Sequence, residues 1–299
     1  MKTKGLGNIW GLVVFGSFIV ALFAVDVMTN NGNFSFFQFP NLNGNKNSGL
    51  DSNGEADTDI RTDVLVKRLY KPQKEIFKGA SYDVAVVNLN LADIAFFWKN
   101  EGGEKIHTFH DLDLQLQQEH KKLLFATNGG MFTPAHEPVG LYIEESKLLQ
   151  KNNLEKDKKG NFFLHPNGIF YLTKDSTANI VPSTDFNDSL KQITKYATQS
   201  GPMLLIDGEI HPKFGKESKN TNIRSGVGII DAQTLVFAIS NEEVNFYDFA
   251  SFFQQKFGCE NALYLDGVIS EMYLPELGRY DSVGKFGVMI GVFEGMGEI

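Results

Sequence analysis

The sequence has one cysteine among 299 residues, Cys259, which excludes an intramolecular disulfide and a zinc site built on several cysteines. It also lacks clustered positive charge: the formal net charge is −8, and the only short basic run, residues 156–159, is typical of a solvated loop. Binding to nucleic acid needs a concentrated excess of Lys and Arg. We therefore predict no nucleic-acid partner.

Several motifs that carry chemistry are missing too. No H-E-x-x-H motif occurs, and the spacing from His107 to His110 falls in a strand-like segment, where it does not align the two rings. The nucleotide motifs G-x-x-x-x-G-K and G-x-G-x-x-G are absent, as is the G-x-S-x-G pattern of serine hydrolases. The sequence thus predicts no metal site, no cofactor and no serine nucleophile.

One long hydrophobic run is present, over residues 9–25, and it follows Lys2 and Lys4. Its length is that of the shortest membrane-spanning helices. A cleaved signal peptide is the alternative, but the small residues that precede a cleavage site are poorly matched. We predict a membrane anchor over residues 1–25. The lysines should stay in the cytoplasm, which places the folded domain outside it, in the periplasm or at the cell surface.

Residues 26–59 are rich in Asn, Gly and Ser and have almost no periodic apolar pattern, which predicts a flexible tether. The remainder, residues 60–299, is expected to form one domain. Its many short apolar runs predict an α+β fold, a sheet-rich single domain with a few packed helices, and the 26 phenylalanines predict an aromatic core.

The clearest predicted helix is Phe246–Phe257, whose phenylalanines recur at helical spacing and which Gly258 ends. Residues 189–198 are a second predicted helix, and residues 111–121 fit either a helix or a strand. Residues 82–90 and 94–98 are predicted strands around a short turn. The other predicted strands are residues 123–126, 139–143, 168–172, 203–206, 226–230, 236–239, 261–265 and 288–293.

Asp266 is the leading candidate for chemistry, because it ends a buried strand and Gly267 follows it at once. This arrangement holds a carboxylate at the edge of a pocket, although Asp-Gly is also a common turn. Asp207 precedes Gly208 in the same way, but there a hairpin turn is the better interpretation. Glu271 could supply a second carboxylate or could be an exposed or salt-bridged residue.

Other candidates follow or precede predicted strands. Arg224 could bind a phosphate or hold Asp266 ionised, or it could be a surface arginine at the end of a loop. Asn128, Gly129 and Gly130 are expected to bind substrate, with a tight turn as the alternative. Ser200 and Gly201 are expected to shape its pocket or to form an ordinary loop, and Asn241 and Glu242 are lesser candidates for substrate binding.

In order along the chain, these segments resemble the phosphodiester glycosidase family, and an exported bacterial branch of it in particular. The resemblance covers about residues 82–293 and rests on N-G-G-M-F at 128–132, S-G-P at 200–202, R-S-G-V-G at 224–228 and L-D-G at 265–267 with Ser270. Val268 and Ile269 stand where the family often has glycines, and Glu271 stands where it has a small residue. The resemblance implies a sheet-rich α+β fold whose motif loops gather at one pocket.

The resemblance also implies a reaction, cleavage of a C1–O bond between a sugar and a phosphate through an oxocarbenium-like transition state. Arg224 would hold the phosphate, and Asp266 would stabilise C1 or activate water. We predict an extracytoplasmic hydrolase of sugar-1-phosphodiester bonds in envelope glycan or exopolysaccharide, whose partners are that carbohydrate and the membrane. The alternatives are a non-catalytic protein that binds glycan or assists its assembly, and a phosphodiesterase that cleaves P–O.

Overall fold

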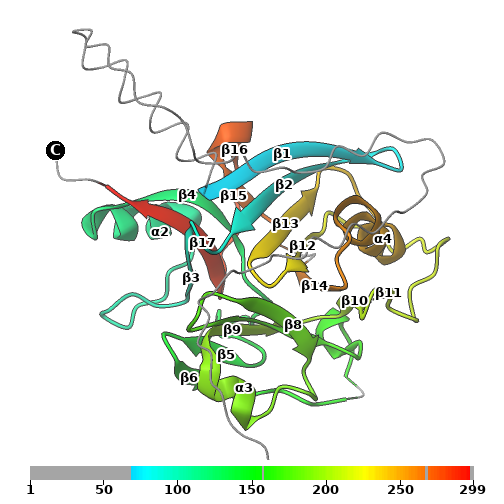
Figure 1. Ribbon diagram of the computed structural model, residues 1–299, viewed down its shortest axis with the longest axis horizontal. Coiled ribbons are helices and arrows are strands. Elements are labelled where there is room, and N and C mark those ends of the chain that lie inside the picture. Colours follow the sequence, from blue (N-terminus) through cyan, green and yellow to red (C-terminus); the bar gives the residue numbers. More distant parts are fainter. Residues whose placement is uncertain (1–68, 157, 267–268, 297–299) are drawn as a thin grey trace, which may run out of the picture. The chain divides into compact units, whose positions relative to one another are not determined.

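The computed structural model describes residues 69–156, 158–266 and 269–296 (Figure 1). The predicted anchor and the predicted tether both lie outside these residues. Within the described ranges, no helix has the length and apolar character needed to cross a membrane.

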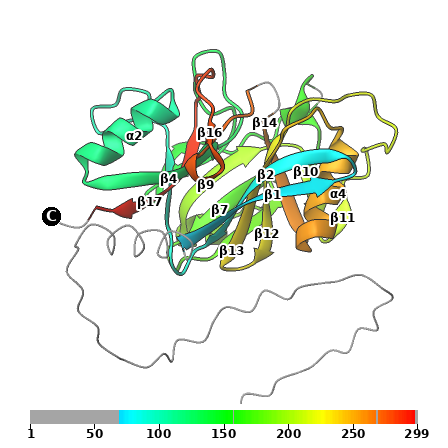
Figure 2. The same cartoon turned by 90° about the horizontal axis from the view of Figure 1, so that it is seen from above.

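The strands of the described residues form three antiparallel sheets (Figures 1 and 2). The largest sheet has the order β1-β2-β13-β12-β14-β10-β11. Its strands are β1 (Tyr70–Phe77), β2 (Ala80–Asn88), β10 (Met203–Ile206), β11 (Glu209–Ile210), β12 (Ser225–Asp231), β13 (Thr234–Ser240) and β14 (Asn261–Asp266).

The other two sheets have five strands each. The second has the order β16-β15-β4-β17-β3 and contains β3 (Asp93–Phe97), β4 (Lys121–Asn128), β15 (Met272–Leu274), β16 (Arg279–Tyr280) and β17 (Met289–Gly295). The third has the order β6-β5-β9-β7-β8 and contains β5 (Tyr142–Glu144), β6 (Lys147–Gln150), β7 (Gly168–Thr173), β8 (Ala178–Pro182) and β9 (Thr194–Ser200).

The three sheets share one core, and aromatic side chains join them. Phe237 of β13 is fully buried, and its ring centroid lies 5.2 Å from that of Phe125 in β4 and 6.1 Å from that of Phe170 in β7. Each of these rings comes from a different sheet. Aromatic rings bury a large apolar area, so this contact fixes the three sheets against one another and confirms the predicted aromatic core.

Three α-helices lie in the described residues: α2 (Phe109–Gln118), α3 (Asp188–Ile193) and α4 (Phe246–Phe257). Helix α4 has the bounds predicted from its phenylalanines, with Asn245 as N-cap and Gly258 in the left-handed region at its end. Helix α4 lies beside the largest sheet (Figure 1), and its buried phenylalanines pack against that sheet. The glycines of β12 permit this close approach, since a Cβ on Gly228 would lie 2.7 Å from Phe253 Cδ1.

One local prediction was wrong. The helix predicted over residues 189–198 ends at Ile193, and the following residues form β9, a central strand that pairs with both β5 and β7. Pairing on both sides outweighs the helical spacing of the sequence there. The strands predicted over residues 82–90 and 94–98 are confirmed as β2 and β3, with a turn between them. They lie in different sheets, because β2 pairs with β13 whereas β3 pairs with β17. Strand β1 was not predicted at all.

Candidate active site

The four motifs of the sequence meet where strands of all three sheets begin or end. Asn128 ends β4, Ser200 ends β9, Ser225 begins β12 and Asp266 ends β14. Ser225 is the direct partner of Asp266 in the β12–β14 pairing, and the Ser225 hydroxyl lies 3.0 Å from Asn128 Oδ1. Residues far apart in the chain therefore line one locality.

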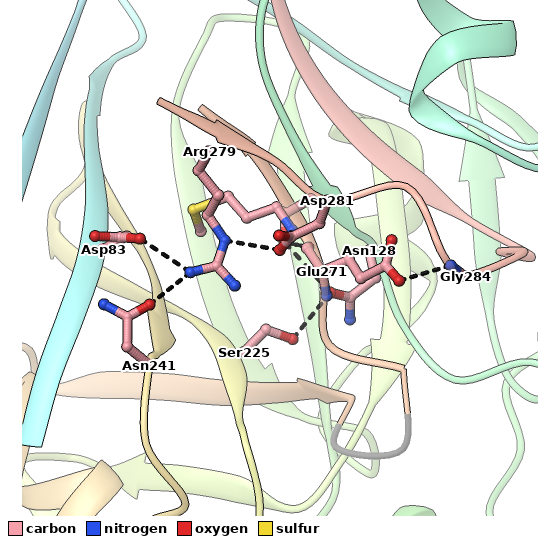
Figure 3. Close-up of polar contacts among 10 residues, drawn as sticks. Asp83, Asn128, Ser225, Asn241, Glu271, Arg279, Asp281 and Gly284 are labelled. Carbon is pink, nitrogen blue, oxygen red and sulfur yellow. Dashed lines mark hydrogen bonds and ion pairs between the residues drawn. The ribbon is translucent and has the colours of Figure 1, made fainter. Parts of the chain in front are cut away.

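The Asn128 side chain is completely buried, and its orientation is fixed by donors. Its Oδ1 atom accepts from the Ser225 hydroxyl and from the Glu271 backbone N–H, at 3.0 and 3.3 Å (Figure 3). Reversing the amide would set Nδ2 against that N–H. In the part of the chain that the structure describes, Asn128 Nδ2 itself has no hydrogen-bond partner. A buried donor in this state is suited to receive a ligand oxygen.

Asp266 is 7% exposed, and its backbone is held by the two serines that flank it in space. The Ser225 hydroxyl lies 3.3 Å from the Asp266 carbonyl oxygen, and the Ser270 hydroxyl donates to the same oxygen. Ser200, which is also buried, donates to the carbonyl of Leu265 at 2.9 Å. These bonds fix the end of β14, so Ser200 positions the candidate carboxylate by holding the backbone of the preceding residue.

Gly129, Gly130 and Gly201 follow the ends of β4 and β9, and they permit close packing there. The Gly129 N–H donates to the Val288 carbonyl at 2.7 Å, so this amide is not free to bind a sugar hydroxyl or a phosphate oxygen as the sequence analysis expected. A Cβ on Gly130, whose φ is +149°, would lie 2.7 Å from Thr198 Oγ1. Gly201 is similar, since a Cβ there would lie 2.5 Å from Asn167 Cβ. The three glycines allow β4 and β9 to approach their neighbours.

A cleft of about 650 Å³ opens beside these motifs. Its polar lining comes from the loop before β12, from the end of β13 and the residues after it, from the segment before β15, and from β16 with the residues that follow it. The charged members of this lining are Glu243, Glu271, Arg279 and Asp281. Sequence reasoning found only Glu271 among these four.

Arg279 and Asp281 belong to a partly buried ionic cluster that joins two sheets (Figure 3). Arg279 Nη1 lies 2.9 Å from Asp83 Oδ2 of β2, and Arg279 Nε lies 2.7 Å from Asp281 Oδ2. Asp83 is 196 positions from Arg279 in the chain, so no local motif could reveal the pair. The sequence did offer one weak signal for the other pair: Arg279 and Asp281 are two positions apart, and residues at that spacing in an extended segment point to the same side.

Glu271 lies in the cleft with one carboxyl oxygen held and the other unsatisfied. Its Oε1 accepts from the Gly284 N–H at 2.6 Å, whereas among the described residues nothing hydrogen-bonds its buried Oε2. Burial is the main cause that raises the pKa of Glu271 above its ordinary value, the charge of Asp281 adds to the rise, and the Gly284 hydrogen bond opposes it. The carboxyl can therefore keep a proton at a higher pH than an exposed glutamate.

This pKa shift predicts a pH-dependent stability. The folded chain binds the Glu271 proton more tightly than the unfolded chain does, so the stabilisation is present at low pH and is lost as the pH rises through the raised pKa. From about pH 4 to about pH 7, the free energy of unfolding of the wild type should therefore fall relative to that of Glu271→Gln. Urea unfolding at a series of pH values measures this. The exposed Glu217→Gln is the matched control, and a difference no larger than the control's contradicts the prediction.

Arg224 does not line the cleft. Its guanidinium is fully buried and donates to the carbonyl of Val244 at 2.8 Å, to the carbonyl of Asn220 at 2.8 Å and to the Tyr264 hydroxyl at 3.2 Å. It also stacks on Phe246, 3.6 Å from the ring centroid. Burial lowers the pKa of Arg224, and the interaction with Tyr264 opposes this. The geometry favours a role in holding the loop before β12 over direct contact with a substrate.

Tyr264 contacts this arginine and lies two residues before the candidate carboxylate Asp266 in β14. Burial raises the pKa of Tyr264 most strongly, Arg224 opposes the rise, and the charge of Asp266 adds to it. Tyr264 therefore lies close to both groups.

The two candidates after β13 face in different directions. Asn241 Oδ1 accepts from Arg279 Nη1 at 2.6 Å, so Asn241 belongs to the cleft (Figure 3). Glu242 instead accepts from the backbone N–H of Ser81 at 2.6 Å and from the Ser81 hydroxyl, at the start of β2. The next residue, Glu243, lines the cleft. Across the described ranges, no group of three or more His, Cys, Asp or Glu side chains is placed to hold a metal ion.

The fold and this constellation define a class of protein. The phosphodiester glycosidase family model matches residues 121–290, which include Asn128, Ser200, Arg224 and Asp266. The chain belongs to the phosphodiester glycosidase family, which confirms the resemblance and points to a glycosidase-type hydrolase.

Comparisons with individual proteins give one relative in sequence and two proteins of similar fold. The chain is 38% identical over 188 residues to the uncharacterised Escherichia coli K12 protein YigE, covering 63% of this chain and 72% of that protein. Its fold is similar to the catalytic domain of zebrafish N-acetylglucosamine-1-phosphodiester alpha-N-acetylglucosaminidase, with a TM-score of 0.51, 16% identity, and coverage of 74% of this chain and 81% of that one. A hypothetical protein from Synechocystis gives a TM-score of 0.47 at 13% identity, over 75% of this chain and 61% of that one.

Proposed function

We propose that this protein hydrolyses sugar-1-phosphodiester bonds, with its active site at the cleft beside Asp266. The observation that carries the proposal is a pair of unsatisfied buried polar atoms, Asn128 Nδ2 and Glu271 Oε2, at the site where the family motifs meet. Buried polar atoms without a hydrogen-bond partner cost stability unless a ligand or water supplies that partner, and such atoms are characteristic of binding sites. Membership of the phosphodiester glycosidase family supports the reaction class.

In the proposed reaction, the bond between sugar C1 and the phosphate oxygen breaks and a water oxygen attaches to C1. Asp266 stabilises the positive charge that develops at C1 or takes the proton of the attacking water. Glu271 gives a proton to the leaving phosphate oxygen, or accepts a hydrogen bond from the sugar. Phosphate is a weak base, so acid assistance contributes less here than in the hydrolysis of an ordinary glycoside.

Asn128 would orient the sugar or the attacking water through its Nδ2 donor. Its other amide atom is already fixed by Ser225 and by the Glu271 backbone, so the donor direction is set before the substrate arrives. Fixed donors of this kind lower the barrier because they need no reorganisation during the reaction.

We further propose that the enzyme acts outside the cytoplasm, on envelope glycan or exopolysaccharide, as a membrane-anchored protein. The hydrophobic run at residues 9–25, preceded by two lysines, supports this location. A protease-protection experiment on intact and permeabilised cells tests it. Protection of residues 60–299 from externally added protease after the outer layers are opened would contradict it.

The reaction itself is tested with the full-length chain in detergent, a panel of sugar-1-phosphodiesters and ¹⁸O-labelled water. We expect release of reducing sugar and an unlabelled phosphomonoester, because C1–O cleavage leaves every original oxygen on phosphorus. The phosphate product is the readout, since a free reducing sugar exchanges its anomeric oxygen with water. Label in the phosphate would assign P–O cleavage instead. Tight binding of a glycan without any turnover would favour the non-catalytic alternative.

A further inference from the structure

We propose that Arg279 is the anion-binding residue of the cleft, and that Asp83 and Asp281, which hold it, limit the anion to a single negative charge. The ligand class is a phosphodiester rather than a phosphomonoester. This inference rests on the proposed function in so far as it takes that anion to be the phosphodiester group of the substrate. Neither the family motifs nor the sequence patterns include these three residues.

The hydrogen bonds of Arg279 leave one side of its guanidinium open. An arginine has five N–H donors, of which Nε uses one on Asp281, and Nη1 uses two on Asp83 and Asn241. The two N–H groups of Nη2 remain, and within the described residues Nη2 makes no hydrogen bond or ion pair. In Figure 3 it is the guanidinium nitrogen of Arg279 that no dashed line reaches. Arg279 lines the cleft, and we take these two donors to be the ones that an anion there would meet.

The arginine is also held rigidly before any ligand binds. Its three partners come from three places, namely β2, the segment after β13 and the residue after β16, and its side chain is 16% exposed. Asp281 is itself fixed, because its Oδ2 also accepts from the Met272 N–H at 3.0 Å. A preorganised guanidinium loses little entropy on binding, which favours recognition of a weakly charged ligand.

The charges around the arginine determine which anion fits. Two carboxylates already contact its single positive charge. Among the described residues that line the cleft, Arg279 is the one cation, and Glu243, Glu271 and Asp281 are acidic. A phosphodiester carries one negative charge, whereas a phosphomonoester carries nearly two above its second pKa of about 6. The surplus of carboxylates disfavours the second charge.

This charge arrangement would also help the product to leave. Hydrolysis of a phosphodiester produces a phosphomonoester, which gains a second negative charge near neutral pH. The same carboxylates that tolerate the substrate then repel the product. We therefore expect weak product inhibition above about pH 7.

Two simple probes test the proposal without any turnover: diethyl phosphate, a monoanion, and ethyl phosphate, a dianion at pH 8. Calorimetric titration of the full-length protein should show diethyl phosphate binding at least about tenfold more tightly. Arg279→Gln should lose binding of both. Asp281→Asn keeps an oxygen that can accept from Arg279 and from Met272 but removes the charge, so it should reduce the preference to about threefold or less. The exposed Asp188→Asn, which makes the same change in net charge, should leave the preference unaltered.

Thermal unfolding of each variant shows whether it is folded. Wild-type protein that binds ethyl phosphate as tightly as diethyl phosphate, or binds neither, overturns the proposal. So does an unchanged preference in folded Asp281→Asn, or unchanged binding in folded Arg279→Gln. Because binding is read directly, the expected preference together with no hydrolysis of any sugar phosphodiester would refute only the proposed function. Hydrolysis of a sugar phosphodiester, together with a preference for diethyl phosphate that Asp281→Asn leaves unchanged, would refute only this inference.

Discussion

Replacing Asp266 by asparagine is expected to lower kcat for sugar release by about 10³-fold, within the range lost when a positioned catalytic carboxylate is removed. Asparagine has the same shape but cannot stabilise a positive charge at C1 or accept a proton from water. The supports of the strand end act on backbone atoms, through Ser225 and Ser270, so they survive the change. Steady-state hydrolysis of the best substrate of the panel measures the effect, and substrate binding should persist.

The chain provides a matched control in Asp207→Asn. Asp207 also follows a strand and precedes a glycine, but it lies exposed in the β10–β11 turn with a φ of +50°, a conformation that asparagine accepts well. Its replacement should leave kcat within about twofold of the wild-type value. Equal activity of Asp266→Asn and wild type would remove Asp266 from the chemistry.

Replacing Arg224 by methionine is expected to lower the free energy of unfolding by about 3–5 kcal/mol, because a buried polar network loses its centre. The carbonyls of Val244 and Asn220 and the Tyr264 hydroxyl would lose their donors, and Phe246 would lose the stacked guanidinium. A domain of this size has about 5–15 kcal/mol in total, so the loss is large. Denaturant unfolding measures it.

Arg279→Met is the comparison that separates the two arginines. Arg279 is partly exposed, so its replacement should cost less stability than that of Arg224 while abolishing binding of diethyl phosphate. Arg224→Met, kept below its unfolding temperature, should bind diethyl phosphate with little change. A folded Arg224→Met that has lost this binding would restore Arg224 as the phosphate contact expected from the sequence.

Several elements could be predicted because their cause is local. The phenylalanine spacing, Asn245 and Gly258 are enough to specify α4, and the Asp207-Gly208 pair specifies the turn between β10 and β11. The β9 segment could not be predicted in the same way. Its residues become a strand because β5 and β7 pair with it on both sides, and that pairing is not visible in the segment itself.

The candidate site divides along the same line. Asn128, Ser200 and Asp266 were found from the sequence because each ends a strand beside glycine, which is a local pattern. Arg224 was also found, but its burial against Phe246 and its bonds to carbonyls depend on how α4 and the loop before β12 pack. The Gly129 amide looked available in the sequence, yet β17 supplies its acceptor.

The sequence by itself determined the family, the sheet-rich fold class and the motif residues at the strand ends, since these follow from short-range patterns in residue type. Only the tertiary structure decided which arginine faces the cleft and which carboxylates surround it. Asp83 and Arg279 are 196 positions apart and meet only because β2 and β16 are brought together by the shared core of three sheets. The charge that a ligand may carry in this cleft is set by such long-range contacts.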